Sequence, residues 1–161
     1  EIKNKAGYTF SKWSDNETSS TYTFQLLEDK TIGPVYTANT NTPYTVIHEQ
    51  MDLDGVGYTE YERENLTGTT DTEVTPAVKT YTGFTAPNTQ TVTINGDGTT
   101  TVTYQYTRNM YIFGLVNSSY IECETPPGMY YYETEITVTA KSIFDNTVTG
   151  TATILVAENQ T

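Results

Sequence analysis

Apolar and polar residues alternate along short stretches of this chain, and turn-forming residues separate the stretches. Runs rich in Val, Ile, Thr and Tyr end at clusters of Gly, Pro, Asn and Asp, which recur at intervals of roughly 8 to 15 residues. This period of two places successive side chains on opposite faces of a strand, as in half-buried antiparallel sheets. We therefore expect an all-β or β-rich fold with an antiparallel, sandwich-like arrangement.

The N-terminal segment predicts a three-stranded meander followed by a linker. Residues 8–13, 21–26 and 31–37 alternate as strands and are separated by polar turns. Residues 38–43 show no apolar period and end in a proline, which is typical of a linker or a domain boundary.

The central segment predicts two hairpins. Residues 44–50 and 58–66 alternate on either side of an Asp- and Gly-rich turn, and a helical turn is plausible at residues 74–79, where Pro76 suits the first helical position. Residues 89–94 and 99–106 flank Asn95-Gly96-Asp97-Gly98, which predicts a tight hairpin whose turn residues need positive φ angles. The later strand is predicted to bury the alternating side chains Val102, Tyr104 and Tyr106.

The C-terminal segment predicts four further strands. They are residues 111–116, 120–123, 130–140 and 148–156, with a turn at 117–119 between the first two. The last strand is exposed to edge pairing if it has no partner.

Charge and composition exclude several classes of function. The 161 residues carry 20 acidic and 8 basic side chains, a net charge of −12, so a phosphate-backbone binder is not expected. One Cys and one His provide neither an internal disulfide nor a structural zinc site. Because no apolar run approaches the ~20 residues that span a bilayer, we expect no membrane insertion, and any signal peptide or anchor would lie outside this sequence.

Candidate catalytic and metal-binding residues are few. Asp52, Asp54 and Gly55 resemble the start of a calcium loop, but Arg63 stands where a bidentate Glu is needed, which favours a plain turn and leaves calcium as the alternative. His48 lacks a recognisable nucleophile partner, and the two carboxylates beside Cys123 would raise its thiol pKa. We therefore expect no enzyme activity and no cofactor.

Two sets of acidic and basic residues admit a second interpretation. The carboxylates on one face of the strand at 58–66 are interpreted as a solvated face rather than a glycosidase pair, because neighbours on a strand form no cleft; they are Glu60, Glu62 and Glu64. Lys12, Lys79 and Lys141 could form isopeptide crosslinks with Asn or Asp, but the sequence does not pair them.

Aromatic residues and the last strand are the candidates for ligand binding or assembly. Tyr8, Trp13 and Tyr22, with the run Tyr130–Tyr132, could form a platform for sugar stacking or pack in a core. On one strand Tyr130 and Tyr132 would share a face. The candidates for pairing between copies are Thr151, Thr153 and Leu155.

Several motifs between residues 44 and 109 resemble repeats of bacterial cell-surface proteins. The motifs are Tyr44-Thr45-Val46, Asp54-Gly55-Val56-Gly57-Tyr58, Leu66-Thr67-Gly68-Thr69-Thr70, Val74-Thr75-Pro76, Tyr81-Thr82-Gly83-Phe84 and Thr101-Val102-Thr103-Tyr104. They are similar to an internalin-type B repeat or the related mucin-binding-protein repeat. The resemblance implies a β-grasp-like module that acts as a spacer or presents a ligand, with no catalytic residues.

The flanking segments resemble halves of a second surface repeat. Residues 7–37 are similar to its second half, and its first half is displaced to residues 111–141, while residues 136–156 resemble the closing strands of a bacterial immunoglobulin-like domain. The predicted domains are a split sandwich-like repeat, 1–37 plus 110–161, and a β-grasp-like module, 44–109, after the linker 38–43. Two alternatives stay open: a tandem array cut out of frame, or a strand that completes the sheet of the next copy.

These observations predict a non-enzymatic, extracellular structural repeat, a stalk, spacer or adhesin module of a bacterial surface or secreted protein. The alternatives are a self-assembling fibre or virion appendage subunit and a carbohydrate-binding module. The expected partners are neighbouring repeats or copies of itself, with a host or environmental glycan or protein ligand left open. Nucleic acid is not an expected partner.

Overall fold

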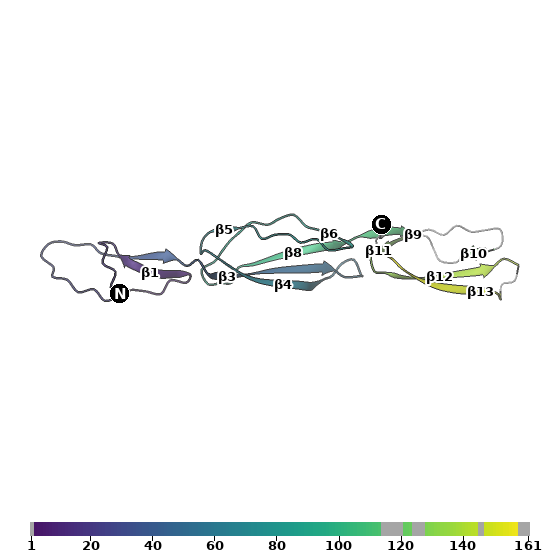
Figure 1. The fold of residues 1–161 in the computed structure, drawn as a ribbon, viewed down its shortest axis with the longest axis horizontal. Coiled ribbons are helices and arrows are strands. Elements are labelled where there is room, and N and C mark those ends of the chain that lie inside the picture. The colour runs from purple at the N-terminus through teal and green to yellow at the C-terminus, as the bar shows by residue number, and fades with distance from the viewer. Residues whose placement is uncertain (1, 114–120, 124–127, 145–146, 158–161) are drawn as a thin grey trace. The chain divides into compact units, whose positions relative to one another are not determined.

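A computed structural model describes residues 2–113, 121–123, 128–144 and 147–157 (Figure 1). Within these residues the fold is all-β, as the alternation pattern predicts, and no helix is present. Contacts divide the chain into two compact units. Unit 1 is Glu1–Ile47, Arg63–Ala77 and Thr89–Thr103; unit 2 is His48–Glu62, Val78–Asn88 and Tyr104–Thr161.

The N-terminal hairpin of unit 1 has two strands rather than the predicted three. Strand β1 (Tyr8–Trp13) pairs antiparallel with β2 (Pro34–Ala38). Residues 21–26 form no strand, so the meander prediction is wrong. The alternation there serves aromatic packing instead: Tyr22 lies 6.2 Å from the Trp13 ring, centroid to centroid.

A four-stranded mixed sheet has the order β4-β3-β8-β6. Its strands are β3 (Thr42–Met51), β4 (Tyr58–Gly68), β6 (Phe84–Thr85) and β8 (Thr101–Arg108). The predicted hairpin of 44–50 and 58–66 is therefore confirmed. Val102, Tyr104 and Tyr106 are buried, as predicted, and Tyr44, Val46 and His48 form the buried face of β3.

The predicted helical turn at residues 74–79 is wrong. Short strands β5 (Glu73–Val74) and β7 (Val92–Thr93) pair antiparallel, with Val74 opposite Val92. The Thr75 and Thr91 hydroxyls continue this contact at 2.7 Å. A partner far along the chain therefore holds this segment extended, which overrides the local signal from Pro76.

The Asn95–Gly98 turn is present, but its flanking strands do not form the predicted hairpin. The Gly98 N–H donates to the Asn95 carbonyl at 3.0 Å, and Gly98 alone of the four turn residues has a positive φ, 76°. Strand β7 pairs with β5, whereas β8 pairs with β6. The turn thus leads the chain from one sheet to another.

In the described residues of the C-terminal part of unit 2, the strands form two small sheets. Strand β9 (Met110–Phe113) pairs with β11 (Gly128–Tyr131), and the second sheet has the order β10 (Ile121–Cys123), β12 (Glu135–Ser142), β13 (Thr149–Leu155). The predicted single strand 130–140 is wrong, because the chain turns at Glu133, whose φ is +67°. The predicted strand residues 114–116, the turn 117–119 and the side chain of Cys123 lie outside what the structure describes.

Candidate functional site

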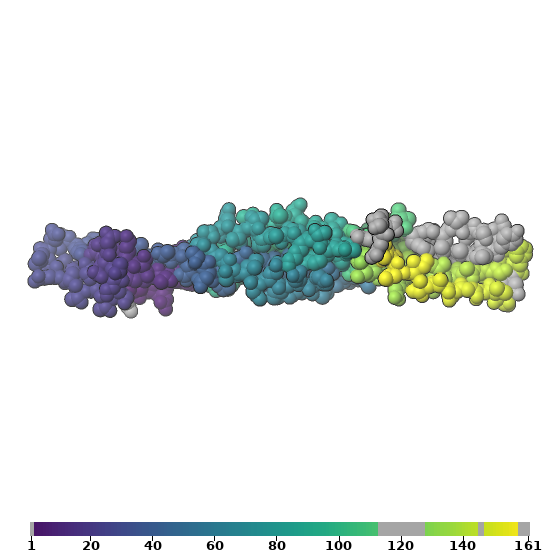
Figure 2. Space-filling model, in the orientation of Figure 1, coloured from purple at the N-terminus to yellow at the C-terminus, as the bar shows by residue number. Residues whose placement is uncertain are grey.

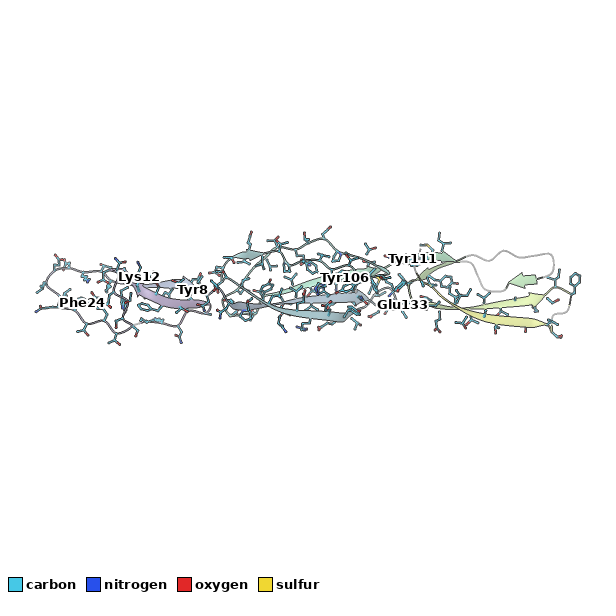
Figure 3. The ribbon with its side chains drawn as sticks, viewed as in Figure 1. Tyr8, Lys12, Phe24, Tyr106, Tyr111 and Glu133 are labelled. Atoms are coloured by element: carbon cyan, nitrogen blue, oxygen red, sulfur yellow. The ribbon has the colours of Figure 1, made fainter. Side chains whose placement is uncertain are left out.

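Unit 2 contains a cluster of histidine and tyrosine rings in mutual contact. It consists of His48, Tyr61, Tyr81, Tyr104 and Tyr106. Because β3 and β8 alternate in phase, His48 and the tyrosines at 104 and 106 point to the same buried face, and all three have no exposed surface. The His48 ring lies 5.8 Å from each of these two rings. Figure 3 labels Tyr106 among the side chains of β8.

Hydrogen bonds hold the cluster in one arrangement. The Tyr106 hydroxyl accepts the backbone N–H of Lys79 at 2.9 Å and lies 2.9 Å from His48 Nδ1. The Tyr106 hydroxyl keeps its own O–H while its oxygen accepts from Lys79, and the tautomer of His48 decides which group donates between this hydroxyl and Nδ1. Burial raises the pKa of Tyr106, which keeps its hydroxyl protonated.

An ion pair closes the solvent side of the cluster. The Lys79 ammonium lies 2.5 Å from one Glu62 oxygen, and the Tyr81 hydroxyl donates to the other at 2.8 Å. Lys79 and Tyr81 hold the pKa of Glu62 below its ordinary value, whereas burial and the neighbouring carboxylate raise the pKa of Tyr81. Tyr81 and Tyr106 therefore stay protonated at neutral pH and act as hydrogen-bonding residues of the cluster.

A pocket of about 330 Å³ lies against this cluster. Its lining combines four aromatic rings with polar side chains: Tyr61, Tyr81, Phe84 and Tyr132, with Gln50, Thr80, Thr82 and Glu133. Tyr61 is 63% exposed. The arrangement can stack a flat apolar face against a ring and offer hydrogen bonds at its rim.

Unit 1 contains a second organised group, which we call the Asn39 junction. Its members are Gly7, Tyr8, Thr9, Asn39, Thr70, Asp71, Thr72 and Ile94. The Asn39 N–H donates to the Gly7 carbonyl at 2.8 Å, and the Asn39 carbonyl accepts the Thr70 N–H at 2.9 Å. The Asn39 side-chain oxygen accepts the Thr9 hydroxyl at 2.7 Å. One asparagine thus joins two segments that are far apart in the sequence.

Unit 2 contains the same arrangement, which we call the Asn109 junction. Its members are Gly83, Phe84, Thr85, Asn109, Tyr132, Glu133, Thr134 and Val156. Asn109 N–H donates to the Gly83 carbonyl at 2.9 Å, and the Asn109 carbonyl accepts the Tyr132 N–H at 2.8 Å. The Thr85 hydroxyl donates to the Asn109 side-chain oxygen at 2.7 Å.

The turns that donate an N–H to the two asparagine carbonyls have the same backbone conformation and hydrogen bonds. Asp71 and Glu133 both have positive φ angles, +59° and +67°, and their N–H groups donate to Ile94 and Val156 carbonyls at 2.8 Å. The return bonds run from Ile94 N–H to Thr72 at 3.0 Å and from Val156 N–H to Thr134 at 2.9 Å. A non-glycine residue with positive φ needs such surroundings to hold it.

A largely covered arginine side chain fills the Asn109 junction. The Arg108 side chain is 9% exposed; its Nη1 lies 2.6 Å from a Glu133 carboxylate oxygen and donates to the Tyr132 carbonyl, while Nε donates to the Met51 carbonyl. Its guanidinium also covers the Phe84 ring at 4.7 Å. In the Asn39 junction the matching ring is Tyr8, whose hydroxyl donates to Asp71.

The sequence-predicted aromatic residues occupy two different places. In unit 1 Trp13 packs against Phe10 and Tyr22, and its indole N–H donates to the Ser19 carbonyl at 2.9 Å. Tyr22 packs against Trp13 and donates to Asp15, so these two platform candidates of unit 1 contact each other and their own loop. Tyr8 belongs to the Asn39 junction.

The candidates in unit 2 lie at the Asn109 junction and in β13. Tyr130 lies in β11, whereas Tyr132 follows that strand, so one strand does not present both rings; Tyr132 packs against Phe84 at 6.1 Å. Thr151, Thr153 and Leu155 lie in β13, which is paired with β12 and is exposed (Figure 2, yellow).

The Asp52–Gly57 turn uses its carboxylates internally. Asp54 accepts the N–H groups of Val56 and Gly57 at 2.9 and 3.0 Å, which lowers the pKa of Asp54, and Asp52 accepts the Thr59 hydroxyl at 2.8 Å. Both carboxylates therefore act as turn acceptors. Of the lysines considered for crosslinks, Lys12 contacts Asn16 in an exposed loop, whereas Lys79 pairs with Glu62.

Sequence reasoning missed Asn39 and Asn109, which were interpreted as parts of a linker and a module end. A signal was available, because each follows the pattern Tyr-Thr-x, and Gly-Tyr-Thr at residues 7–9 parallels Gly-Phe-Thr at 83–85. It was too short to stand out in a Thr-rich chain.

Comparisons of the chain with protein-family models, with curated proteins and with solved structures found no match. Across the described residues there is no helix with the length and apolar character to cross a membrane.

Proposed function

We propose that this chain is a non-enzymatic structural repeat, a stalk or spacer of a bacterial surface or secreted protein. The observation that carries the proposal is the repetition of one junction: each unit contains an asparagine that joins two distant segments through the same three hydrogen bonds. Segments connected by flexible linkers move freely, whereas backbone hydrogen bonds across a joint restrict that motion. A spacer needs its successive segments to be held in fixed positions, which the hydrogen bonds of each junction would provide.

Composition supports the extracellular part of the proposal. The net charge of −12 favours solubility and gives no attraction to anionic surfaces. The histidine–tyrosine cluster supports the non-enzymatic part, because the Tyr106 hydroxyl is bonded to His48 and to the Lys79 N–H, and the Tyr81 hydroxyl is bonded to Glu62. The predicted split of the chain into 1–37 plus 110–161 and 44–109 stays a prediction.

The distance between two spin labels tests the spacer function. Cys123→Ser removes the single cysteine, and Thr107→Cys and Thr151→Cys introduce labels on exposed positions of β8 and β13, which lie in unit 2 on either side of Asn109. We expect one narrow distance distribution by pulsed electron resonance. A control with three glycines inserted after Asn109 should broaden it. A distribution in the original chain as broad as in this control would overturn the proposal.

The pocket of unit 2 favours carbohydrate binding as a second candidate function. Sugar rings stack on exposed aromatic faces, and Gln50 and Glu133 offer polar groups beside Tyr61. Titration with a panel of neutral oligosaccharides, followed by amide chemical shifts, tests this candidate. We expect shifts around the pocket that Tyr61→Ala abolishes and that Leu66→Ala, an exposed residue of the same strand, leaves unchanged. Shifts that persist in Tyr61→Ala would contradict it.

A further inference from the structure

The pocket of unit 2 has aromatic rings in its walls that face in different directions. Tyr61 and Tyr81 meet edge to face, with ring centroids 5.1 Å apart and ring planes at 75°. Phe84 and Tyr132 meet in the same way, at 6.1 Å and 73°. All four rings line one cavity of about 330 Å³ whose residues belong to unit 2. Rings at such angles can enclose a compact group from more than one side.

The charge at the pocket is acidic. Of its eight lining residues none is basic, and the charged one is Glu133, whose side chain is 53% exposed (Figure 3). The basic side chains that bond beside the pocket are each paired with a carboxylate, Arg108 with Glu133 and Lys79 with Glu62. The whole chain carries a net charge of −12, which attracts cations and repels anions. A positively charged ligand therefore fits this pocket better than an anion.

Aromatic faces elsewhere in this chain already hold cations. The Lys5 ammonium lies 3.6 Å from the centre of the Tyr8 ring, and beside the pocket the Arg108 guanidinium lies 4.7 Å from the centre of the Phe84 ring. A ring attracts a cation to its negative face, most strongly where the cation loses contact with water. The Tyr61 ring, which is 63% exposed, is accessible to a cation from solution.

A hydrogen bond strengthens one of these rings as a cation acceptor. The Tyr81 hydroxyl donates to a Glu62 carboxylate oxygen at 2.8 Å. Donation to an anion polarises the phenol and moves electron density towards its ring, which makes the ring face more negative. The Lys79 ammonium on the other Glu62 oxygen holds this carboxylate in place.

We propose that the pocket of unit 2 binds a compact organic ammonium group, enclosed by the aromatic rings of its lining and placed beside the Glu133 carboxylate. Enclosure by several rings is how proteins recognise ammonium groups that carry carbon substituents. The inference goes beyond the spacer function, and for the second candidate function it names the charge of the ligand. The ammonium group belongs either to a small quaternary compound or to an amino sugar, and the test distinguishes the two.

Two matched pairs of compounds test the charge, each titrated into the full chain and followed by amide chemical shifts. Choline is compared with the alcohol of the same shape in which carbon replaces the nitrogen, and glucosamine is compared with glucose. We expect the charged member of at least one pair to bind about tenfold more tightly, with shifts at the pocket residues. A preference in the first pair assigns the group to a quaternary compound, and a preference in the second assigns it to an amino sugar.

Substitutions at Tyr61 test the part played by the rings. Tyr61→Leu removes one ring but keeps an apolar side chain, so the preference for the charged member should fall to less than about threefold. Tyr61→Phe keeps the ring and should retain the preference. Phe24→Leu is the matched control, because Phe24 is an aromatic residue of unit 1 that is 41% exposed, and its loss should leave binding unchanged.

Three results overturn the proposal: no preference for the charged member in either pair, a preference that Tyr61→Leu leaves intact, or a preference that Phe24→Leu reduces equally. Pocket shifts with neutral oligosaccharides, without a preference for the charged members, would overturn it and leave the second candidate function standing. None of these results alters the spin-label distances, so the spacer function is tested separately.

Discussion

The Asn39 and Asn109 junctions share a backbone and differ in the side chains that fill it. Both use an asparagine that bonds to a glycine carbonyl, a threonine hydroxyl and an incoming N–H. In the Asn39 junction the residue before the asparagine is the small Ala38, and Gly7 lies against the backbone of Gly96. The Asn109 junction is filled by the Arg108 guanidinium, which binds two carbonyls and a carboxylate.

This difference shows which part of a junction specifies its geometry. The hydrogen bonds of the backbone and of one asparagine are the same in the two junctions, although Ala38 stands in one where Arg108 stands in the other. We infer that the backbone hydrogen bonds define the geometry of a junction and that its side chains set how much the junction contributes to the free energy of unfolding.

The largest expected effect is the loss of Arg108. Arg108→Met removes the donor to the Met51 and Tyr132 carbonyls and leaves them unpaired in a half-buried site, which should cost roughly 3 kcal/mol of unfolding free energy. Urea denaturation measures it. Lys5, whose ammonium covers Tyr8 as Arg108 covers Phe84, provides the matched variant, and Lys5→Met should change the stability little. Equal losses in both variants would break the comparison.

A methyl group on the junction glycine should be the next largest effect. Gly7 and Gly83 have φ angles of +74° and +78°, and a Cβ at either would overlap a neighbour, the Gly96 backbone in one case and the Tyr132 ring in the other. We expect Gly7→Ala to cost about 2 to 3 kcal/mol and Gly83→Ala about 1 to 2 kcal/mol, because a ring moves more easily than a backbone. The reverse order in thermal denaturation would refute this explanation.

The two asparagines should be equivalent. Asn39→Ala and Asn109→Ala each remove the acceptor of one threonine hydroxyl at 2.7 Å and keep the backbone bonds, so each should cost about 1 kcal/mol. Denaturant titration of the two variants in parallel provides the measurement. A difference of more than about 1 kcal/mol between them would show that the joints are not copies of one frame.

The smallest expected effect is the pH dependence of stability that the Glu62 carboxylate causes. Its folded-state pKa lies below the ordinary value of 4.5, so the carboxylate contributes stability above that pH and loses it as the pH falls through the folded-state pKa. The original chain should therefore be more stable than Glu62→Gln at pH 7, and the two should converge under acidic conditions. Melting curves between neutral and acidic pH measure this; a gap that widens on acidification would have the wrong sign.

The sequence predicted local features well and partners poorly. The buried face of β8 followed from the alternation of Val102, Tyr104 and Tyr106, because burial on one face imposes a period of two. The strand at 21–26 and the helical turn at 74–79 failed for the same reason: their conformations depend on Trp13 and on Val92, which lie elsewhere in the chain. The Asn95–Gly98 turn was predicted, yet its neighbouring strands joined different sheets.

The candidate sites show the same limit. His48 was set aside as a nucleophile, but its partners Tyr104 and Tyr106 come from another strand, so no local motif reveals the cluster. The junction asparagines became visible only once their hydrogen bonds could be compared.

Amide hydrogen exchange at the junctions tests the central claim most directly. The N–H groups of Asn39, Thr70, Asn109 and Tyr132 carry the bonds that define the two joints. If the two junctions share the same backbone hydrogen bonds, the four amides exchange slowly and are protected to the same degree in both junctions. Their protection should exceed that of the irregular segment at 21–26 by about a hundredfold or more. Exchange of the Asn109 and Tyr132 amides at the rate of that segment, with Asn39 and Thr70 protected, would contradict the claim.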